Sequence, residues 1–283
     1  MPETPMPHLD LHAQRPVRRP SAALLVLEPW RAAWEYLAHK RGASARRPGA
    51  DVDAAVDSCF GADGHPVVLF PGLASDGRAL APLRKHCAAL GYDTIDWGRG
   101  FNTGPQGDAG IWLSDLADHT LKLLAGTTQS ATLLGWSLGG VYAREVAKLL
   151  GARVRQVITI GTPFNADADH SNVGWIYRLL SNTPQVFDPA LSARLRTAPA
   201  MPTTSIYSRS DGVVAWQTCA HRHATAQAED IEVTSSHLGM GWNPEVLQVV
   251  ADRLAQRPGA WQPYRQMPHT VPHAIPARKP ARA

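Results

Sequence analysis

The sequence predicts an α/β protein with a doubly wound, mostly parallel sheet of about six strands. From residue 66 onwards, short and continuously apolar runs alternate with segments of helical periodicity. This is the pattern of parallel strands that are buried on both faces and joined by helices. The length of 283 residues and a hydrophobic content of 44% fit one large core of this kind.

The elements follow one another without an internal repeat. The first helix of the alternation ends at Gly91, a residue that readily takes the backbone conformation found at helix ends. The apolar runs predict strands over 66–70, 92–97, 132–136, 154–160, 203–207 and 231–234. The segments between and after them predict helices over 77–90, 109–124, 141–150 and 244–254.

The chain is organised as one folded domain with two Pro-rich ends. The domain is predicted over 51–256, with a helical cap at about 163–202. Five prolines in 1–20, and a Pro- and Arg-rich composition in 257–283, predict disordered tails. Residues 21–50 are expected to form an N-terminal helical extension.

The helix of this extension, predicted over 29–41, carries an apolar stripe. Leu27, Trp30, Trp34 and Leu37 recur at three- and four-residue spacing. We favour the interpretation that the stripe covers an apolar patch of the main domain. The alternative is a weak peripheral contact with a membrane, to which the basic ends of the chain could add.

Charge and cysteine content limit the classes of partner. The chain has 28 basic and 24 acidic residues; 1–50 hold eight and four, 257–283 hold five and none, which leaves 15 and 20 for 51–256. Basic residues confined to the ends argue against a nucleic-acid partner. Three cysteines without metal-ligand spacing, and no apolar run of about 18 residues, are typical of a cytoplasmic protein without a bound metal.

The motif Gly135-Trp-Ser-Leu-Gly139 carries the clearest chemical signal. An apolar run ends at Trp136 and a helix-like run follows, so that Ser137 is expected at a tight strand-to-helix turn. Such a turn lifts the hydroxyl above the sheet at the positive end of a helix. The sequence therefore predicts that Ser137 is a nucleophile.

A serine nucleophile needs a base and a group that orients the base. Asp211 and His237 each follow a predicted strand, at the edge of a parallel sheet where such groups gather. The order Ser-Asp-His along the chain is the order expected when the nucleophilic serine stands at such a strand-to-helix turn. The rivals considered are His221, His223 and Asp188.

Two backbone N–H groups are expected to stabilise an oxyanion. One is that of Leu138, which follows the nucleophile at a helix start. The other is that of Leu73, in the loop after the first strand, where Gly72 would let the backbone turn toward the site.

Taken together, these motifs resemble the α/β-hydrolase superfamily and its lipase- and esterase-like members. The resemblance covers about 66–256 and implies hydrolysis through an acyl-enzyme, without a cofactor. Trp136 stands where lipases usually have histidine, and the motif is also similar to that of methyl-ester esterases acting on carrier-bound acyl chains. The matching segments are 67–73, 135–139, 161–164, 210–212 and 236–237.

The expected function is that of a serine carboxylic-ester hydrolase acting on a small hydrophobic ester. Trp136 and the apolar residues Trp175, Tyr177 and Phe187 of the cap are expected to line the substrate pocket. The forty residues of the cap could instead complete the core. An acyl-thioesterase or acyltransferase with the same triad, and a non-catalytic lipid-binding module, remain open alternatives, and the oligomeric state is left open.

Overall fold

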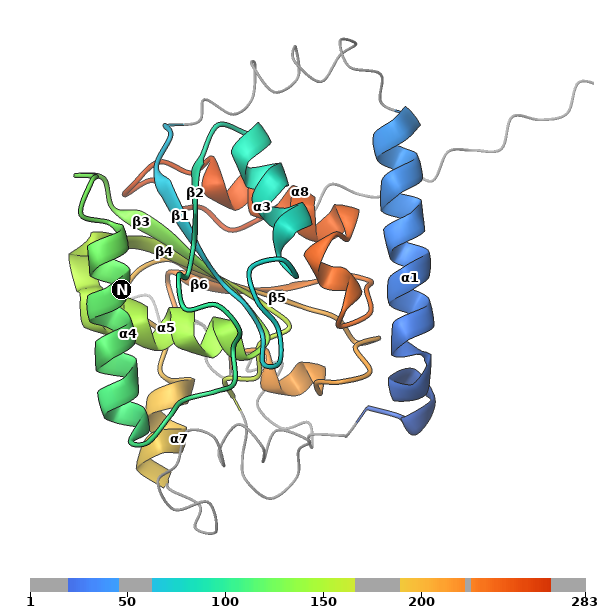
Figure 1. Ribbon diagram of the computed structural model, residues 1–283, viewed down its shortest axis with the longest axis horizontal. Coiled ribbons are helices and arrows are strands. Elements are labelled where there is room, and N and C mark those ends of the chain that lie inside the picture. Colours follow the sequence, from blue (N-terminus) through green and yellow to red (C-terminus); the bar gives the residue numbers. More distant parts are fainter. Residues whose placement is uncertain (1–19, 46–62, 166–188, 222–224, 266–283) are drawn as a thin grey trace, which may run out of the picture.

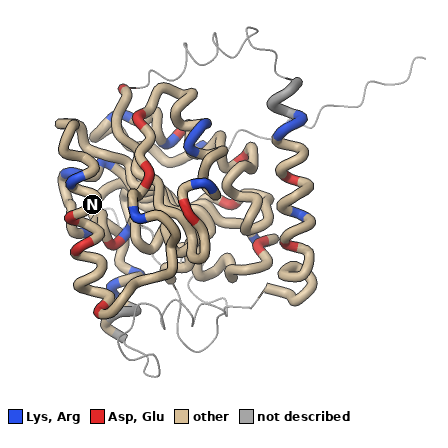
Figure 2. The backbone as a smooth tube through the Cα atoms, in the orientation of Figure 1, with Lys and Arg blue, Asp and Glu red and all other residues tan. Residues whose placement is uncertain are grey.

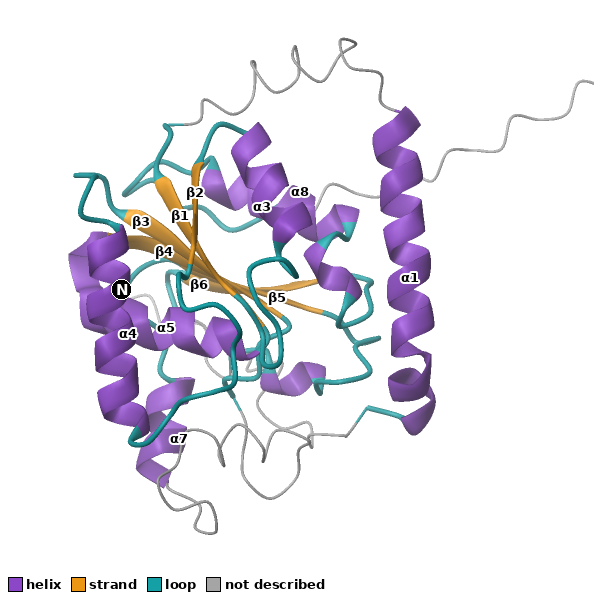
Figure 3. Cartoon of the chain, in the orientation of Figure 1, coloured by secondary structure: helices purple, strands orange, loops and turns teal. Residues whose placement is uncertain are grey.

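The computed structural model of the chain describes residues 20–45, 63–165, 189–221 and 225–265. Its centre is a sheet of six parallel strands in the order β2-β1-β3-β4-β5-β6. Figures 1 and 3 show the strands enclosed by helices. In chain order the strands are β1 (Pro66–Phe70), β2 (Asp93–Asp96), β3 (Ala131–Trp136), β4 (Val154–Ile160), β5 (Thr203–Tyr207) and β6 (Ala228–Glu232).

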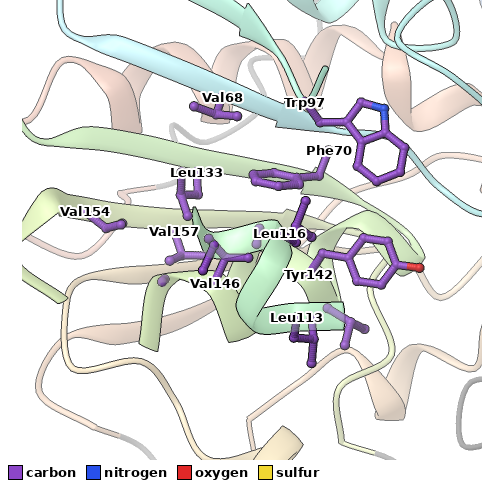
Figure 4. Packing of buried hydrophobic residues seen from close by; sticks show 14 of the residues in the cluster. Val68, Phe70, Trp97, Leu113, Leu116, Leu133, Tyr142, Val146, Val154 and Val157 are labelled. Atoms are coloured by element: carbon purple, nitrogen blue, oxygen red, sulfur yellow. The ribbon is translucent and has the colours of Figure 1, made fainter. Parts of the chain in front are cut away.

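Helices cover both faces of the sheet. On one face α4 (Ala109–Leu123) and α5 (Leu138–Leu150) pack against alternate strand residues, and Figure 4 shows Phe70 and Leu133 of the strands on the same side of the sheet as Tyr142 of α5. On the other face α3 (Ala81–Ala89) and α8 (Pro244–Leu254) pack against the strand residues in between. Because both faces are buried at the centre of the sheet, the central strands β1 and β3 are largely apolar. Short 3-10 turns lie at Gly151–Arg153, Trp216–Thr218 and Gly239–Gly241.

The predicted doubly wound parallel sheet is confirmed, with local errors at element ends. β6 spans Ala228–Glu232, whereas the prediction was 231–234. It is an edge strand paired only with β5, and Glu229 in it accepts hydrogen bonds from Thr204 and Arg253. A polar edge strand of this kind has no apolar run, so its bounds could not be predicted from hydrophobicity. In addition, α3 begins at Ala81 rather than 77, and α5 begins directly after Ser137 rather than at 141.

Helix α1 (Ala22–Ala45) is longer than the predicted 29–41 and stands at the side of the molecule next to α8 (Figure 1). Its apolar stripe points away from the body, since Trp30 and Trp34 are 77% and 68% exposed. The interpretation that this stripe covers the domain is therefore wrong. The opposite face packs inward, and there Glu28 is 2% exposed. Figure 2 shows acidic and basic residues along α1.

Several predictions fall on residues that the structure does not describe. They concern 1–19 and 266–283 of the tails and most of the cap, including Trp175, Tyr177 and Phe187. Residues 257–265 are described, and the Tyr264 N–H there donates to Glu229 Oε2 at 2.7 Å, so the prediction of disorder is wrong for this part of the tail. Of the cap, 163–165 and 189–202 are described, and the latter contain α7 (Pro189–Arg196). Within the described ranges, no helix is both long and apolar enough to cross a bilayer.

Candidate active site

Ser137 occupies the tight turn between β3 and α5. Its backbone has φ 54° and ψ −125°, a positive-φ conformation that a residue other than glycine adopts only under strain. The turn is held by the Ser137 N–H, which donates to the Ile160 carbonyl at 2.8 Å. A Cβ at Gly135 would lie 2.3 Å from the Gly139 oxygen, and one at Gly139 would lie 2.2 Å from the Phe70 oxygen. Only glycine fits at these two positions, so the motif has a steric cause.

The structure brings Ser137, Asp211 and His237 together. His237 Nε2 lies 3.1 Å from Ser137 Oγ, and His237 Nδ1 lies 2.6 Å from Asp211 Oδ2. The other carboxylate oxygen of Asp211 accepts the N–H groups of Val213 and Val214 at 2.8 and 2.7 Å. These two amides fix the carboxylate, which in turn orients the imidazole so that Nε2 faces the hydroxyl.

Burial strengthens the coupling between the imidazole and the carboxylates. His237 is 3% exposed, as is Asp211. Burial lowers the pKa of His237, but the charge and the hydrogen bond of Asp211, with the charge of Glu28, raise it by more, so that this pKa lies above its ordinary value. The site therefore favours the imidazolium that forms when His237 takes a proton.

The two proposed oxyanion donors lie on either side of the nucleophile. Leu138 is the first residue of α5, so its N–H has no acceptor within the helix. The loop of Leu73 comes close to the serine, because a Cβ at Gly72 would lie 3.2 Å from Ser137 Cβ. Asn102 holds this loop, since its side-chain N–H donates to the Pro71 carbonyl at 2.9 Å.

An apolar cavity of about 620 Å³ opens beside these groups. Trp136 forms one wall, and its indole N–H donates to the His237 carbonyl at 3.2 Å, so this residue also braces the histidine. Residues of helix α1 also line the cavity, which the sequence did not predict. Among the lining residues are Ala32, Tyr36, Leu73, Trp136, Leu238 and Trp242.

The rival His221 belongs to a different buried network. Its Nδ1 lies 2.7 Å from Asp230 Oδ1, and its Nε2 lies 3.1 Å from the guanidinium of Arg144. Both ring nitrogens are therefore occupied away from Ser137. The other rivals, His223 and Asp188, are outside the described residues. In the part of the chain that the structure describes, no group of three or more His, Cys, Asp or Glu side chains could hold a metal ion.

Solved structures share this architecture. No protein-family model matches the sequence, and no curated protein matches it significantly. Lipase B of Aspergillus fumigatus matches with a TM-score of 0.54 and 19% identity, over 73% of this chain and 58% of that one. A monoacylglycerol lipase of Paleococcus ferrophilus matches with a TM-score of 0.51 and 13% identity, over 67% and 93%. A Bacillus licheniformis lipase matches with a TM-score of 0.51 and 17% identity, over 68% and 92%.

The chain has the α/β-hydrolase fold. It spans less than two thirds of the Aspergillus lipase, and in all three cases the identity is low. The match therefore concerns the fold, and the chemistry has to be argued from the site itself.

One part of the site in this α/β-hydrolase fold was missed from the sequence. Glu28, Arg31 and Glu35 of α1 contact the loops that carry Asp211 and His237. The available signal was their spacing of three and four residues, which places them on one helix face, opposite the tryptophans. Charged residues on such a face are normally assigned to solvent, so the pattern alone pointed the wrong way.

Proposed function

We propose that the protein is a serine hydrolase that cleaves carboxylic esters with a hydrophobic acyl group. The observation that carries the proposal is the unbroken hydrogen-bond chain from Asp211 through His237 to Ser137. These hydrogen bonds end on a strained serine at a helix start, which is the geometry that a nucleophile and its base require. The neighbouring apolar cavity supports a hydrophobic acyl group as the part of the substrate that binds.

The reaction follows from the positions of these groups. His237 Nε2 takes the proton of Ser137 while Oγ bonds to the ester carbonyl carbon. The N–H groups of Leu73 and Leu138 donate to the resulting oxyanion. When the carbon–oxygen bond to the alcohol breaks, the alcohol leaves with the proton from His237. Water then attacks the acyl-enzyme with His237 as base again, and the acid leaves while Ser137 regains its proton.

A fluorophosphonate probe tests the nucleophile directly. The probe forms a bond to an activated serine, so we expect labelling at Ser137 in the wild-type protein and none in Ser137→Ala. The same pair is then compared with p-nitrophenyl esters of graded acyl length. Unlabelled wild-type protein that turns over no ester would overturn the proposal in favour of a lipid-binding module.

The leaving group is tested with the same acyl chains. The geometry also suits an acyl-thioesterase, or an acyltransferase in which an alcohol replaces water. Turnover of acyl-thioesters and of oxoesters, each with and without added alcohol, separates the three reactions. We expect oxoester hydrolysis to be the fastest.

The outward face of α1 supports weak peripheral contact with a lipid surface. Val26, Trp30 and Trp34 are 72%, 77% and 68% exposed on one side of the helix. Tryptophan favours the membrane interface, where its ring is buried and its N–H stays solvated. The same helix lines the apolar cavity with Ala32 and Tyr36, so an ester held in a lipid surface would lie close to the cavity.

A further inference from the structure

Glu28 of α1 is buried against both loops of the candidate triad. Its Oε1 accepts the N–H of Gly212 at 2.6 Å and the N–H of His237 at 3.1 Å. Its Oε2 accepts the N–H of Leu238 at 3.4 Å. One carboxylate thus joins the residue after Asp211 to the backbone of the histidine itself.

A second carboxylate repeats the arrangement two helical turns later. Glu35 Oε1 accepts the N–H of Ser236 at 2.8 Å, and Oε2 accepts the hydroxyl of Ser235 at 2.8 Å. Between the two glutamates, Arg31 donates to the Ser210 carbonyl at 2.5 Å. Hydrogen bonds from neutral donors to a carboxylate are stronger than those between neutral groups. Helix α1 therefore holds the two loops through several such contacts.

The close approach of α1 depends on two glycines. A Cβ at Gly212 would lie 2.5 Å from the backbone of Leu24, and one at Gly239 would lie 1.9 Å from Glu35 Oε2. Each glycine stands one or two residues after a member of the candidate triad. The fit between α1 and the loops is thus built into the backbone, as well as into the glutamate side chains.

We propose that α1 positions the base of the candidate triad: Glu28 and Glu35 hold the loop of His237 where its imidazole reaches Ser137. This inference rests on the hydrolase function proposed above. Neither glutamate contacts the Ser137 hydroxyl, so both are positioning residues. Glu35 acts through the Ser236 amide and the Ser235 hydroxyl, and Glu28 acts through the amides of His237 and Leu238 and the amide that follows Asp211.

Two properties separate positioning from mere stabilisation of the fold. A base displaced by about 1 Å can cost 10²-fold in rate while substrate binding is unchanged, so kcat falls and KM does not. The charge of Glu28, together with Asp211, also raises the pKa of His237. Glu35 contacts the same loop and Arg31 the loop of Asp211, but of these three α1 residues Glu28 is the one whose charge raises the pKa of His237, so its removal is expected to move the pH profile.

The experiment compares Glu28→Ala, Glu28→Gln and Glu35→Ala in the full chain. Arg41→Gln is the matched control, because it also removes a charge from α1 but lies on an exposed part of the helix. The measurements are kcat and KM for p-nitrophenyl acetate, the fluorophosphonate labelling rate, the pH profile and the thermal midpoint. A short acyl group keeps the walls of the cavity out of the comparison.

We expect kcat and the labelling rate to fall about 10²-fold in Glu28→Ala and somewhat less in Glu35→Ala, with little change in KM. Glu28→Gln keeps one acceptor oxygen, so it should recover part of the rate. The acid limb of its pH–activity profile should move to lower pH. This variant also keeps the test valid should Glu28→Ala fail to fold. Arg41→Gln should behave as wild type.

Folded glutamate variants with the wild-type kcat, labelling rate and pH profile would overturn the positioning role. That result would leave the hydrolase function intact, provided that wild-type protein is labelled at Ser137. Absence of labelling in wild-type protein would instead remove the proposed function, and the positioning role with it.

Discussion

Replacing Asp211 with asparagine tests the orientation of the imidazole, and the local geometry predicts how the new amide must lie. Asp211 Oδ1 accepts two backbone N–H groups, from Val213 and Val214. An asparagine NH2 group at that place would face two donors, so its carbonyl oxygen must take it. The NH2 group then occupies the place of Oδ2, 2.6 Å from His237 Nδ1.

This arrangement forces the wrong tautomer on the histidine. Facing a donor, Nδ1 of His237 must present its lone pair, so that the ring proton moves to Nε2. Nε2 then points a proton at Ser137 Oγ and can no longer accept one. An asparagine in place of a triad aspartate costs about 10⁴-fold in kcat, which corresponds to about 5 kcal/mol of transition-state stabilisation.

The assay is the turnover of a p-nitrophenyl ester by Asp211→Asn, with the thermal midpoint measured alongside. Asp230→Asn is the matched control, because Asp230 forms a similar but only partly buried pair with His221, away from the serine. We expect the control to lose stability and to keep kcat in its folded fraction. An Asp211→Asn protein that is folded and within tenfold of wild-type turnover would refute the reasoning.

Three further predictions concern pH, the turn and the helix surface. Since His237 must be neutral to act as base and its pKa is raised, kcat/KM should fall with decreasing pH through a midpoint above 6.5; a midpoint below 6.5 would contradict this. The sign for stability is opposite: the contribution of the charged imidazole is complete below its unfolded-state pKa and is lost as pH rises through the folded-state pKa. Gly135→Ala should lower the free energy of unfolding by about 1–3 kcal/mol, measured with urea, because its Cβ would collide with Gly139; unchanged stability would count against the packing of the turn. The double variant Trp30→Ser/Trp34→Ser should sediment less with anionic vesicles at unchanged turnover of a soluble ester. Equal sedimentation, or a change only in self-association, would argue against lipid contact.

The parts that the sequence predicted well depend on short-range patterns. The strand, the glycines and the helix around Ser137 are adjacent in the chain, so their steric logic is readable locally. That Asp211 and His237 lie near Ser137 could be predicted because parallel strands carry their carboxyl ends to one edge of the sheet. Their meeting at hydrogen-bond distance depends on loop conformations, for which the order of residues gives only a topological argument.

The orientation of α1 could not be predicted for a physical reason. Predicting the inward face of a helix from its apolar residues assumes that the hydrophobic effect decides which face is buried. In α1 the inward face instead supplies hydrogen-bond acceptors, because the loops after β5 and β6 contain N–H groups for which no strand supplies an acceptor. Glu28 and Glu35 face inward because those amides lie beside α1 in the folded chain. The sequence of the helix alone does not show that the amides are there.

The inverted polarity of α1 also explains why this helix belongs to the site. A buried N–H that loses its acceptor costs about 1–3 kcal/mol, and the two glutamates accept from four backbone amides, those of Gly212, Ser236, His237 and Leu238. Without these acceptors the loops would gain by turning their amides toward water. The imidazole is attached to the same backbone, so such a turn would move it away from Ser137. The loop of His237, the proposed base, lies beyond the end of β6, and a helix distant in sequence holds it through carboxylates, beside an edge-to-face contact of Tyr36 with Trp242.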